Sequence, residues 1–241
     1  AHLIDIADAG EKFSLFQYKV AFDKAYQEVL SKGKIPIVCG GSGMYIETAL
    51  GLYDLKEVKE DENLHNNLQK LSKDQLIEML KSKKALHNTT DITDKDRLIR
   101  AIEIAGNEQG KNKGESLYDH APCTEFIYGI DVPRDIVRRR ITSRLETRLK
   151  EGLIDEVKQL IDEGVSAETM QYYGLEYKYV TLYVQGELSY NRMVELLNTA
   201  IHQFAKRQMT WFRRMKRRGV PIKWLPNDPD QIIQTITRDL S

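Results

Sequence analysis

Cysteine and tryptophan are scarce in this chain of 241 residues, and long apolar runs are missing. The two cysteines, Cys39 and Cys123, exclude a disulfide-rich secreted scaffold and favour a reducing compartment. No metal-ligand spacing of cysteine and histidine occurs, and no run of about 18 apolar residues could cross a membrane. We therefore expect a cytoplasmic protein without a membrane partner, in which Cys39 is a small core residue.

An excess of one charge is also absent, because 36 basic residues balance 36 acidic ones. The charges are nevertheless segregated. Residues 200–223 hold eight Lys or Arg and no acid, and residues 131–150 hold seven against three acids. Residues 53–62 are mostly acidic. A neutral chain with basic blocks indicates a local site for a polyanion and not a surface that attracts one everywhere.

The most informative stretch is an apolar run at residues 35–39 that leads into the turn Gly40-Gly41-Ser42-Gly43, after which a helical pattern begins. Glycines let the backbone approach an anion closely, and the N–H groups at a helix start point toward it. The turn has no Walker A lysine. It predicts one wall of a phosphate site, and the alternative is an ordinary tight turn between a strand and a helix.

Hydrophobic periodicity and turn signals predict an α/β fold with a parallel sheet. Expected strands cover residues 2–6, 35–39, 126–132 and 221–225. Expected helices begin at the caps Ser14, Ser72, Thr93 or Asp94, and Ser189, one long helix runs from about residue 135 to Gly164, and residues 169–174 are irregular. Four strands are fewer than a doubly wound sheet usually has, so we expect the first βα unit to be absent from this chain.

The residue pattern changes after Leu52, where polar segments with helical spacing replace the apolar runs typical of strands. We expect residues 53–124 to be a mainly helical insertion, and residues 1–52 and 125–241 to form the α/β core. In the insertion, Arg97 and Arg100 are three residues apart and share a helix face. They form either a guanidinium fork for phosphate or a solvated, salt-bridged face.

The basic block near the C-terminus interleaves cations with aromatic residues. Helical geometry turns Phe204, Trp211 and Phe212 toward the core. The opposite side then carries Lys206, Arg207, Arg213, Arg214, Arg217 and Arg218. A basic helix face of this kind suits a nucleic-acid backbone, and binding would depend on salt.

Several of these motifs occur together in one family. They are His-Leu-Ile-Asp-Ile at 2–6, the glycine turn at 40–46, Asp-Arg-Leu-Ile-Arg-Ala-Ile-Glu at 96–103, the helix at 140–157, Gly-Glu at 186–187, and Ala-Lys-Arg-Gln-Met-Thr-Trp-Phe-Arg at 205–213. Because these motifs occur in the family's order, the sequence resembles the bacterial tRNA dimethylallyltransferases, also called tRNA isopentenyltransferases. The resemblance implies a P-loop NTPase-like, nucleotide- and ATP-binding core with a helical insertion that contacts tRNA. It also implies transfer of a dimethylallyl group from dimethylallyl diphosphate, with Mg2+, to the exocyclic amine of an adenosine beside the tRNA anticodon. We expect the protein to be a monomer.

The resemblance assigns roles to individual residues. Ser42 falls where the family has a catalytic threonine, and Gln171 falls where it usually has an arginine that faces the diphosphate. The implied diphosphate site is Gly40, Gly41, Ser42, Gly43 and Gln171. The implied tRNA contacts are Asp96, Arg97 and Arg100. We expect further tRNA contacts from His65 and from Lys206, Arg207 and Arg213 on the basic helix. The family's P-loop and its general-base aspartate are expected before Ala1.

Two other functions stay open at this point. The changes at Ser42 and Gln171 allow a catalytically inactive RNA-binding homologue. The same core could also prenylate free adenine nucleotides, although a small substrate needs neither the insertion nor the basic helix. A Gly-x-x-x-x-Gly-Lys-Ser/Thr loop upstream, with a nearby aspartate, would favour the tRNA-modifying enzyme.

Overall fold

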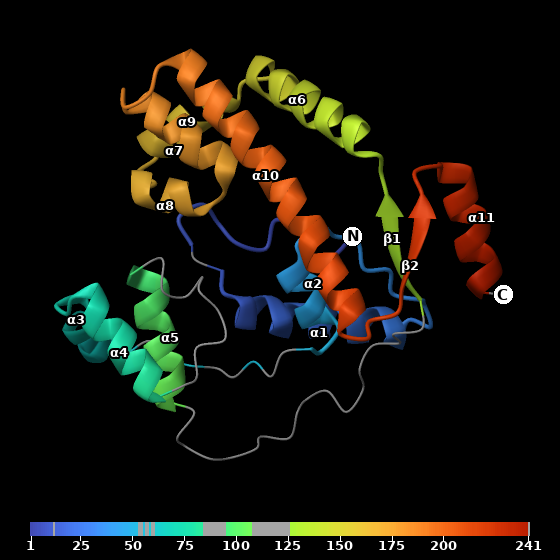
Figure 1. The fold of residues 1–241 in the computed structure, drawn as a ribbon, viewed down its shortest axis with the longest axis horizontal. Helices are drawn as coiled ribbons and strands as arrows, with labels where there is room; N and C mark the ends of the chain where they lie inside the picture. Colours follow the sequence, from blue (N-terminus) through green and yellow to red (C-terminus); the bar gives the residue numbers. More distant parts are fainter. Residues whose placement is uncertain are drawn as a thin grey trace. The chain divides into compact units, whose positions relative to one another are not determined.

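The computed structural model of this chain describes residues 1–11, 13–52, 55, 58, 61–83, 95–107 and 126–240. The chain divides into two compact units (Figure 1). We call Ala1–Tyr53 with Ala121–Ser241 the core unit, and Asp54–His120 the helical unit. Within the described ranges, no helix combines the length and apolar character needed to cross a bilayer. The proposed caps Thr93 and Asp94, and Cys123, lie outside the described residues.

The core unit combines a small parallel sheet with helices. Its elements are α1 (Leu15–Ser31), α2 (Gly43–Ala49), β1 (Ile127–Asp131), α6 (Arg134–Lys150), α7 (Leu153–Asp162), α8 (Ala167–Tyr172), α9 (Leu175–Val184), α10 (Tyr190–Arg217), β2 (Ile222–Pro226) and α11 (Pro229–Leu240). β1 pairs in parallel with β2, with Ile127 opposite Ile222. The strands predicted at 126–132 and 221–225 are therefore confirmed, and so is a parallel sheet.

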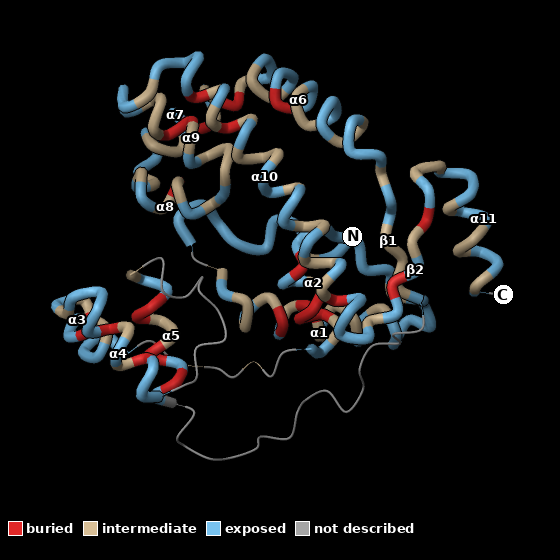
Figure 2. The backbone as a smooth tube through the Cα atoms, viewed as in Figure 1, coloured by how far each residue is buried: buried red, intermediate tan, exposed pale blue. Residues whose placement is uncertain are grey.

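The core unit buries apolar residues in two places among its helices, and Ile222 and Leu225 of β2 are buried as well. Buried residues are drawn in red in Figure 2. Helices α6 to α10 share the larger cluster: Leu145, Leu153, Val157, Met170, Val180, Met193 and Leu197. The second place is where the C-terminal half of α10 contacts α2, which in turn packs on α1. There Phe22, Ala49 and Met215 are buried. Because α10 is 28 residues long, one helix joins the larger cluster to the glycine turn.

The helical unit is built from α3 (Glu62–Gln69), α4 (Lys73–Lys83) and α5 (Lys95–Asn107). Both α3 and α4 pack on α5. The apolar residues that they bury together are Leu68, Leu76, Leu80, Leu98, Ile99, Ile102 and Ala105. With this face buried, the polar residues of α3 and α5 are left to form the network described below.

The helix caps predicted at Ser14, Ser72 and Ser189 are confirmed. Ser14 Oγ accepts from the N–H of Gln17, and the Gln17 side chain accepts from the N–H of Ser14, which is a complete capping box. The Ser72 and Gln75 pair makes the same two bonds before α4. Ser189 caps α10 through the N–H of Arg192. These caps satisfy N–H groups that a helix leaves unpaired, so they are readable from sequence alone.

Two predicted strands are wrong. Residues 2–6 and 35–39 are not strands in the structure. The side chains of Ile35 and Ile37 are 66% and 81% exposed, and Cys39 is exposed and not in the core. A strand needs a neighbour for its backbone hydrogen bonds, and the sheet of the described residues contains β1 and β2 alone. An apolar run is therefore not sufficient to make a strand.

The helical predictions need two corrections. The long helix expected from residue 135 to Gly164 is broken, because Gly152 adopts a left-handed φ of 99° between α6 and α7. That break lets α7 turn and pack against α9. Residues 169–174 are not wholly irregular, since α8 runs to Tyr172 and is capped by Ser166. A spacing that continues across a glycine does not distinguish one helix from two.

Candidate functional site

The glycine turn lies immediately before α2, as the sequence predicts. Ser42 is the N-cap residue of α2, but its side chain makes no capping hydrogen bond and is exposed. Its carbonyl accepts from the N–H of Ile46 at 3.1 Å, so the backbone enters the helix regularly. The Ser42 hydroxyl is thus presented at the start of α2 without being used for the cap.

Helix α10 holds this turn in place. Gln208 Nε2 donates to the carbonyl oxygen of Gly41 at 2.7 Å. One helical turn further, the indole of Trp211 lies directly against Gly43, where an added Cβ would be 2.2 Å from Trp211 Cδ1. Gly43 is required here because of this close approach. Sequence reasoning missed the contact, because it joins residues about 170 positions apart.

Replacing Gly43 with alanine should lower the free energy of unfolding by about 1–3 kcal/mol, the usual cost of overpacking a well-packed site. The new methyl group cannot fit unless the Trp211 ring moves. Urea unfolding of the variant measures this cost. Gly106→Ala is the control, because its added Cβ would lie 3.6 Å from the nearest atom and Gly106 does not have a positive φ. Gly51→Ala is unsuitable as a control, because Gly51 has a positive φ that strains any other residue. Equal stability of Gly43→Ala and the parent would contradict the packing.

A buried ion pair ties α2 to α10 next to the turn. Glu47 Oε2 lies 3.0 Å from a terminal guanidinium nitrogen of Arg214, and the Glu47 side chain is only 2% exposed. The Arg214 guanidinium carbon lies 4.0 Å from the centroid of the Trp211 ring. The prediction that Arg214 projects outward is therefore wrong, because a buried carboxylate on α2 attracts it. Glu47 gave no sequence signal, since its burial depends on the packing of α2.

The other predicted tRNA-binding cations of α10 lie on different sides of the helix. Lys206 and Arg207 are exposed and line a groove with Trp211 and Arg214, whereas Arg213 is exposed outside that lining. Phe204 is 42% exposed, so its predicted place in the core is wrong. The groove has a volume of about 590 Å3.

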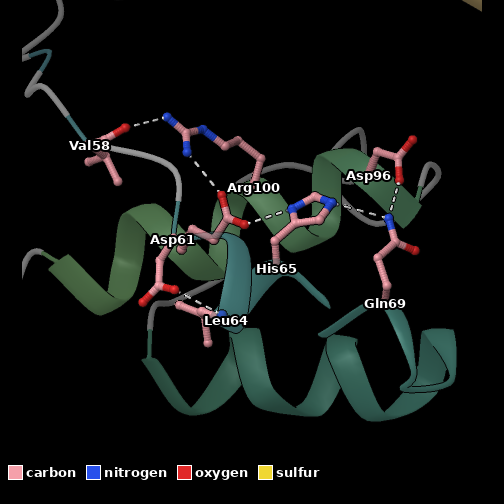
Figure 3. A network of polar contacts seen from close by, with 8 residues as sticks. Val58, Asp61, Leu64, His65, Gln69, Asp96 and Arg100 are labelled. Carbon is pink, nitrogen blue, oxygen red and sulfur yellow. Dashed lines mark hydrogen bonds and ion pairs between the residues drawn. The ribbon is translucent and has the colours of Figure 1, made fainter. Parts of the chain in front are cut away.

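A polar network occupies the helical unit, where four of the predicted tRNA contacts lie (Figure 3). The carboxylate of Glu103, 3% exposed, is 2.9 Å from His65 Nδ1 and 2.9 Å from Arg100. Arg100 also donates to the carbonyl of Val58 at 2.7 Å. Gln69 Nε2 donates to Asp96 at 2.9 Å. The structure thus brings His65 and Arg100 together around one buried carboxylate.

This network is inconsistent with Arg100 as half of an unpaired guanidinium fork for phosphate. Arg100 is directed toward Glu103 and Val58, although its side chain is still 37% exposed. Glu103 was missed as a positioning residue, although its distance of three residues from Arg100 is a sequence signal for a helical ion pair.

The model of the IPP transferase family matches residues 1–215. This chain belongs to the IPP transferase family. It is 50% identical over 224 residues to tRNA dimethylallyltransferase 2 of Porphyromonas gingivalis, covering 93% of this chain and 74% of that protein. It is 44% identical to tRNA dimethylallyltransferase 1 of Geotalea uraniireducens, covering 96% and 76%.

Solved structures agree with this assignment. The full-length tRNA isopentenylpyrophosphate transferase of Bacillus halodurans superposes with a TM-score of 0.66 at 26% identity, covering 99% of this chain and 76% of that one. A eukaryotic dimethylallyltransferase acting on tRNA superposes with a TM-score of 0.73 at 18% identity, covering 99% and 65%, which shows the fold alone. The family resemblance drawn from the sequence is confirmed.

Gln171 is the predicted diphosphate-binding residue of this IPP transferase that does not belong to the glycine turn. It lies half-buried on α8. Within the described part of the chain, no hydrogen bond or ion pair joins it to residues 40–43. Its role at the diphosphate stays a prediction.

A second cavity of this IPP transferase, about 570 Å3, is lined by residues 7–9, α7 and two tyrosines. Tyr177 donates to Glu156 at 2.5 Å, and Arg148 donates to the other oxygen of that carboxylate at 3.0 Å. Burial, and then the hydrogen bond to Glu156, raise the pKa of Tyr177 to about 12. The phenol is therefore a firmly protonated donor at neutral pH.

The raised pKa of Tyr177 predicts a loss of stability at alkaline pH. Because the phenol's pKa rises on folding from about 10 to about 12, its contribution is fully present below pH 10 and is lost as the pH rises through 12. In urea unfolding, Tyr177→Phe should flatten this alkaline decline. Tyr172→Phe, at an exposed site on α8, should not. Parallel pH curves for the parent and Tyr177→Phe would contradict the assignment.

Proposed function

We propose that this IPP transferase moves a dimethylallyl group from dimethylallyl diphosphate to the exocyclic amine of an adenosine beside the tRNA anticodon. The new bond joins the amine nitrogen to the allylic carbon, and the carbon–oxygen bond to the diphosphate breaks. The bonding electrons leave with the diphosphate, and the amine proton passes to the carboxylate general base that the resemblance implies. The observation that carries this proposal is the glycine turn with an unused Ser42 hydroxyl, held against the basic helix α10.

In this reaction the turn would stabilise the departing diphosphate. The backbone N–H groups of Gly40, Gly41 and Gly43 offer donors at close approach, and Ser42 adds a hydroxyl. Preorganised donors lower the barrier because they need not reorient as negative charge develops. The contacts of Gln208 and Trp211 with the turn supply that preorganisation.

We assign the tRNA to the helical unit and to α10. The residues that would contact it are His65, Asp96, Arg97, Arg100, Lys206, Arg207 and Arg213. Cationic side chains on exposed helix faces can bind backbone phosphates, and the adenosine is reached by taking it out of its stack. We also propose a P-loop-like nucleotide-binding core, from the same resemblance, together with a monomeric state and the cytoplasmic location that the scarcity of cysteine favours.

Magnesium is assigned no step in this proposal. In the described ranges, no group of three or more His, Cys, Asp or Glu side chains is arranged to hold a metal ion. Mg2+ usually keeps several waters and binds through one or two carboxylates together with substrate phosphates, so it does not need such a group of protein ligands. We propose Mg2+ only as the counter-ion that the diphosphate itself would bring.

Replacing Arg97 with alanine should weaken tRNA binding by about tenfold, which corresponds to one charge-assisted hydrogen bond of about 1.5 kcal/mol. Binding of a dimethylallyl diphosphate analogue should stay unchanged. Lys81→Ala is the control, because it removes one positive charge from α4 at a surface ion pair. Filter-binding titrations with both variants decide the question. If the Arg97→Ala and Lys81→Ala curves coincide, Arg97 belongs to a solvated face.

The activity itself is tested by incubating the full-length protein, which carries the general base that the resemblance implies, with labelled dimethylallyl diphosphate and one of three acceptors. These are a tRNA with adenosine beside the anticodon, the same tRNA with uridine there, and free AMP. Label in the first tRNA alone supports the proposal. Label in AMP alone indicates prenylation of free nucleotides. tRNA binding without transfer indicates an inactive RNA-binding homologue.

A further inference from the structure

Glu103 is a buried carboxylate of the helical unit that accepts hydrogen bonds from two helices. Its side chain is only 3% exposed, so it is too buried to bind an RNA. His65 Nδ1, on α3, lies 2.9 Å from Oε1 of this carboxylate, and a terminal nitrogen of Arg100, on α5, lies 2.9 Å from Oε2. Each carboxylate oxygen therefore holds a different residue of the proposed tRNA contact.

The same carboxylate also determines which nitrogen of His65 carries the proton. A carboxylate only accepts hydrogen bonds, so Nδ1 must be the donor, and Nε2 is left as an acceptor when the ring is neutral. Gln69 Nε2 lies 3.4 Å from His65 Nε2 and donates to Asp96 Oδ1 at 2.9 Å. Glu103 thus orders a chain of contacts that reaches His65, Asp96 and Arg100 (Figure 3).

Arg100 and His65 stay accessible to a ligand while Glu103 holds them. A guanidinium has five N–H donors, and the bonds of Arg100 to Glu103 and to the carbonyl of Val58 use two of them. The side chains of Arg100 and His65 are 37% and 40% exposed. A side chain that is ordered before the ligand arrives loses less conformational entropy on binding.

Stability alone does not account for a carboxylate at this position. Ile99 and Ile102, on the same helix, are buried in the apolar core of the helical unit. Replacing a buried charged group by an apolar residue often leaves stability unchanged or raises it, because taking a charge out of water is costly. The orientation that Glu103 imposes on its two partners is a separate effect, and it needs the carboxylate.

We propose that Glu103 is a positioning residue for tRNA binding, which acts by holding Arg100 and His65 in the orientation that meets the RNA. This role rests on the proposed function, because that function assigns tRNA to these two residues. Glu103 itself makes no contact with the RNA. If Glu103 only joined α3 to α5, its replacement would lower stability but leave the tRNA affinity of the folded protein unchanged.

Glu103→Gln and Glu78→Gln form a matched pair of variants for testing this role. Both remove one negative charge from the helical unit, but Glu78 is 73% exposed on α4. Removing an acid by itself leaves the affinity for an anionic RNA unchanged or raises it. We expect Glu103→Gln to weaken tRNA binding by about tenfold, as for the loss of one charge-assisted hydrogen bond, and Glu78→Gln not to weaken it. Filter-binding titrations of the full-length protein measure both.

Further variants separate position from charge and from stability. Glu103→Asp keeps the charge but shortens the side chain by one methylene group, so it should not reach both partners and should also weaken tRNA binding. Ile102→Val loosens the apolar core of the same unit and should bind tRNA like the parent. In an Arg100→Ala background, Glu103→Gln should have a smaller effect, because one of its partners is already gone.

A measurement on the unaltered protein covers the case in which the Glu103 variants do not fold. 15N NMR of the full-length protein at about pH 8.5, where an ordinary imidazole is neutral, reports which ring nitrogen of His65 carries the proton. The His65 signals are assigned by their loss in His65→Gln. A proton on Nδ1 is expected, and a proton on Nε2 would overturn the proposal.

The positioning role is also overturned if Glu103→Gln leaves tRNA affinity unchanged or raises it, or if Ile102→Val weakens binding as much. A protein that modifies tRNA while its Glu103 variants keep the parental affinity retains the proposed function and loses the positioning role. A protein whose tRNA binding depends on Glu103, but which transfers no prenyl group, does the reverse. A parent that binds no tRNA refutes both.

Discussion

Replacing Arg214 with glutamine should lower the free energy of unfolding by about 3 kcal/mol, because Glu47 then loses its guanidinium partner inside the protein. The Glu47 side chain is 2% exposed and that of Arg214 is 35% exposed. Removing one partner of a buried pair is costly because the remaining charge has little access to water. We take the lower end of the usual range because Arg214 itself is partly solvated. Urea unfolding at neutral pH measures the loss.

The controls for this prediction come from the same pair of helices. Arg217→Gln removes an exposed arginine three residues further along α10 and should cost less than about 0.5 kcal/mol. The double variant Glu47→Gln with Arg214→Gln should recover part of the loss, since no buried charge is left behind. If Arg214→Gln and Arg217→Gln unfold at the same urea concentration, the ion pair contributes nothing to stability.

Replacing Ser42 with alanine should lower the rate of prenyl transfer by about 100-fold, the low end of the effect of removing one donor that stabilises developing charge. The Ser42 side chain is exposed and makes no capping bond, so folding does not depend on its hydroxyl. The thermal unfolding midpoint should therefore barely change. Single-turnover assays with labelled dimethylallyl diphosphate and saturating tRNA isolate the chemical step from binding.

Ser42→Thr is the matched variant, because it keeps the hydroxyl and restores the residue that the family resemblance implies at this position. It should transfer at nearly the parental rate. A Ser42→Ala variant with a normal single-turnover rate would remove Ser42 from the site. Slow transfer by both variants would indicate that the shape of the turn matters and not the hydroxyl.

The structural features that depend only on neighbouring residues could be predicted from the sequence. The capping boxes at Ser14 and Ser72 and the cap at Ser189 were predicted correctly, because each is formed within four residues. The predictions that failed depended on a distant partner. Residues 35–39 are apolar but not a strand, since no other strand lies beside them in the described part of the sheet. Gly152 divides a helix whose apolar spacing continues on both sides.

The same distinction applies to the site. The sequence by itself determined the family, the glycine turn with its hydroxyl, and the basic character of the last long helix, because these are properties of residue type and order. Only the tertiary structure decided that Gln208, Trp211 and Arg214 hold this turn and α2. The burial of Glu47, which draws Arg214 inward, arises when α2 packs between α1 and α10. Local sequence cannot specify it, because the energy of a buried charge depends on which distant groups surround it.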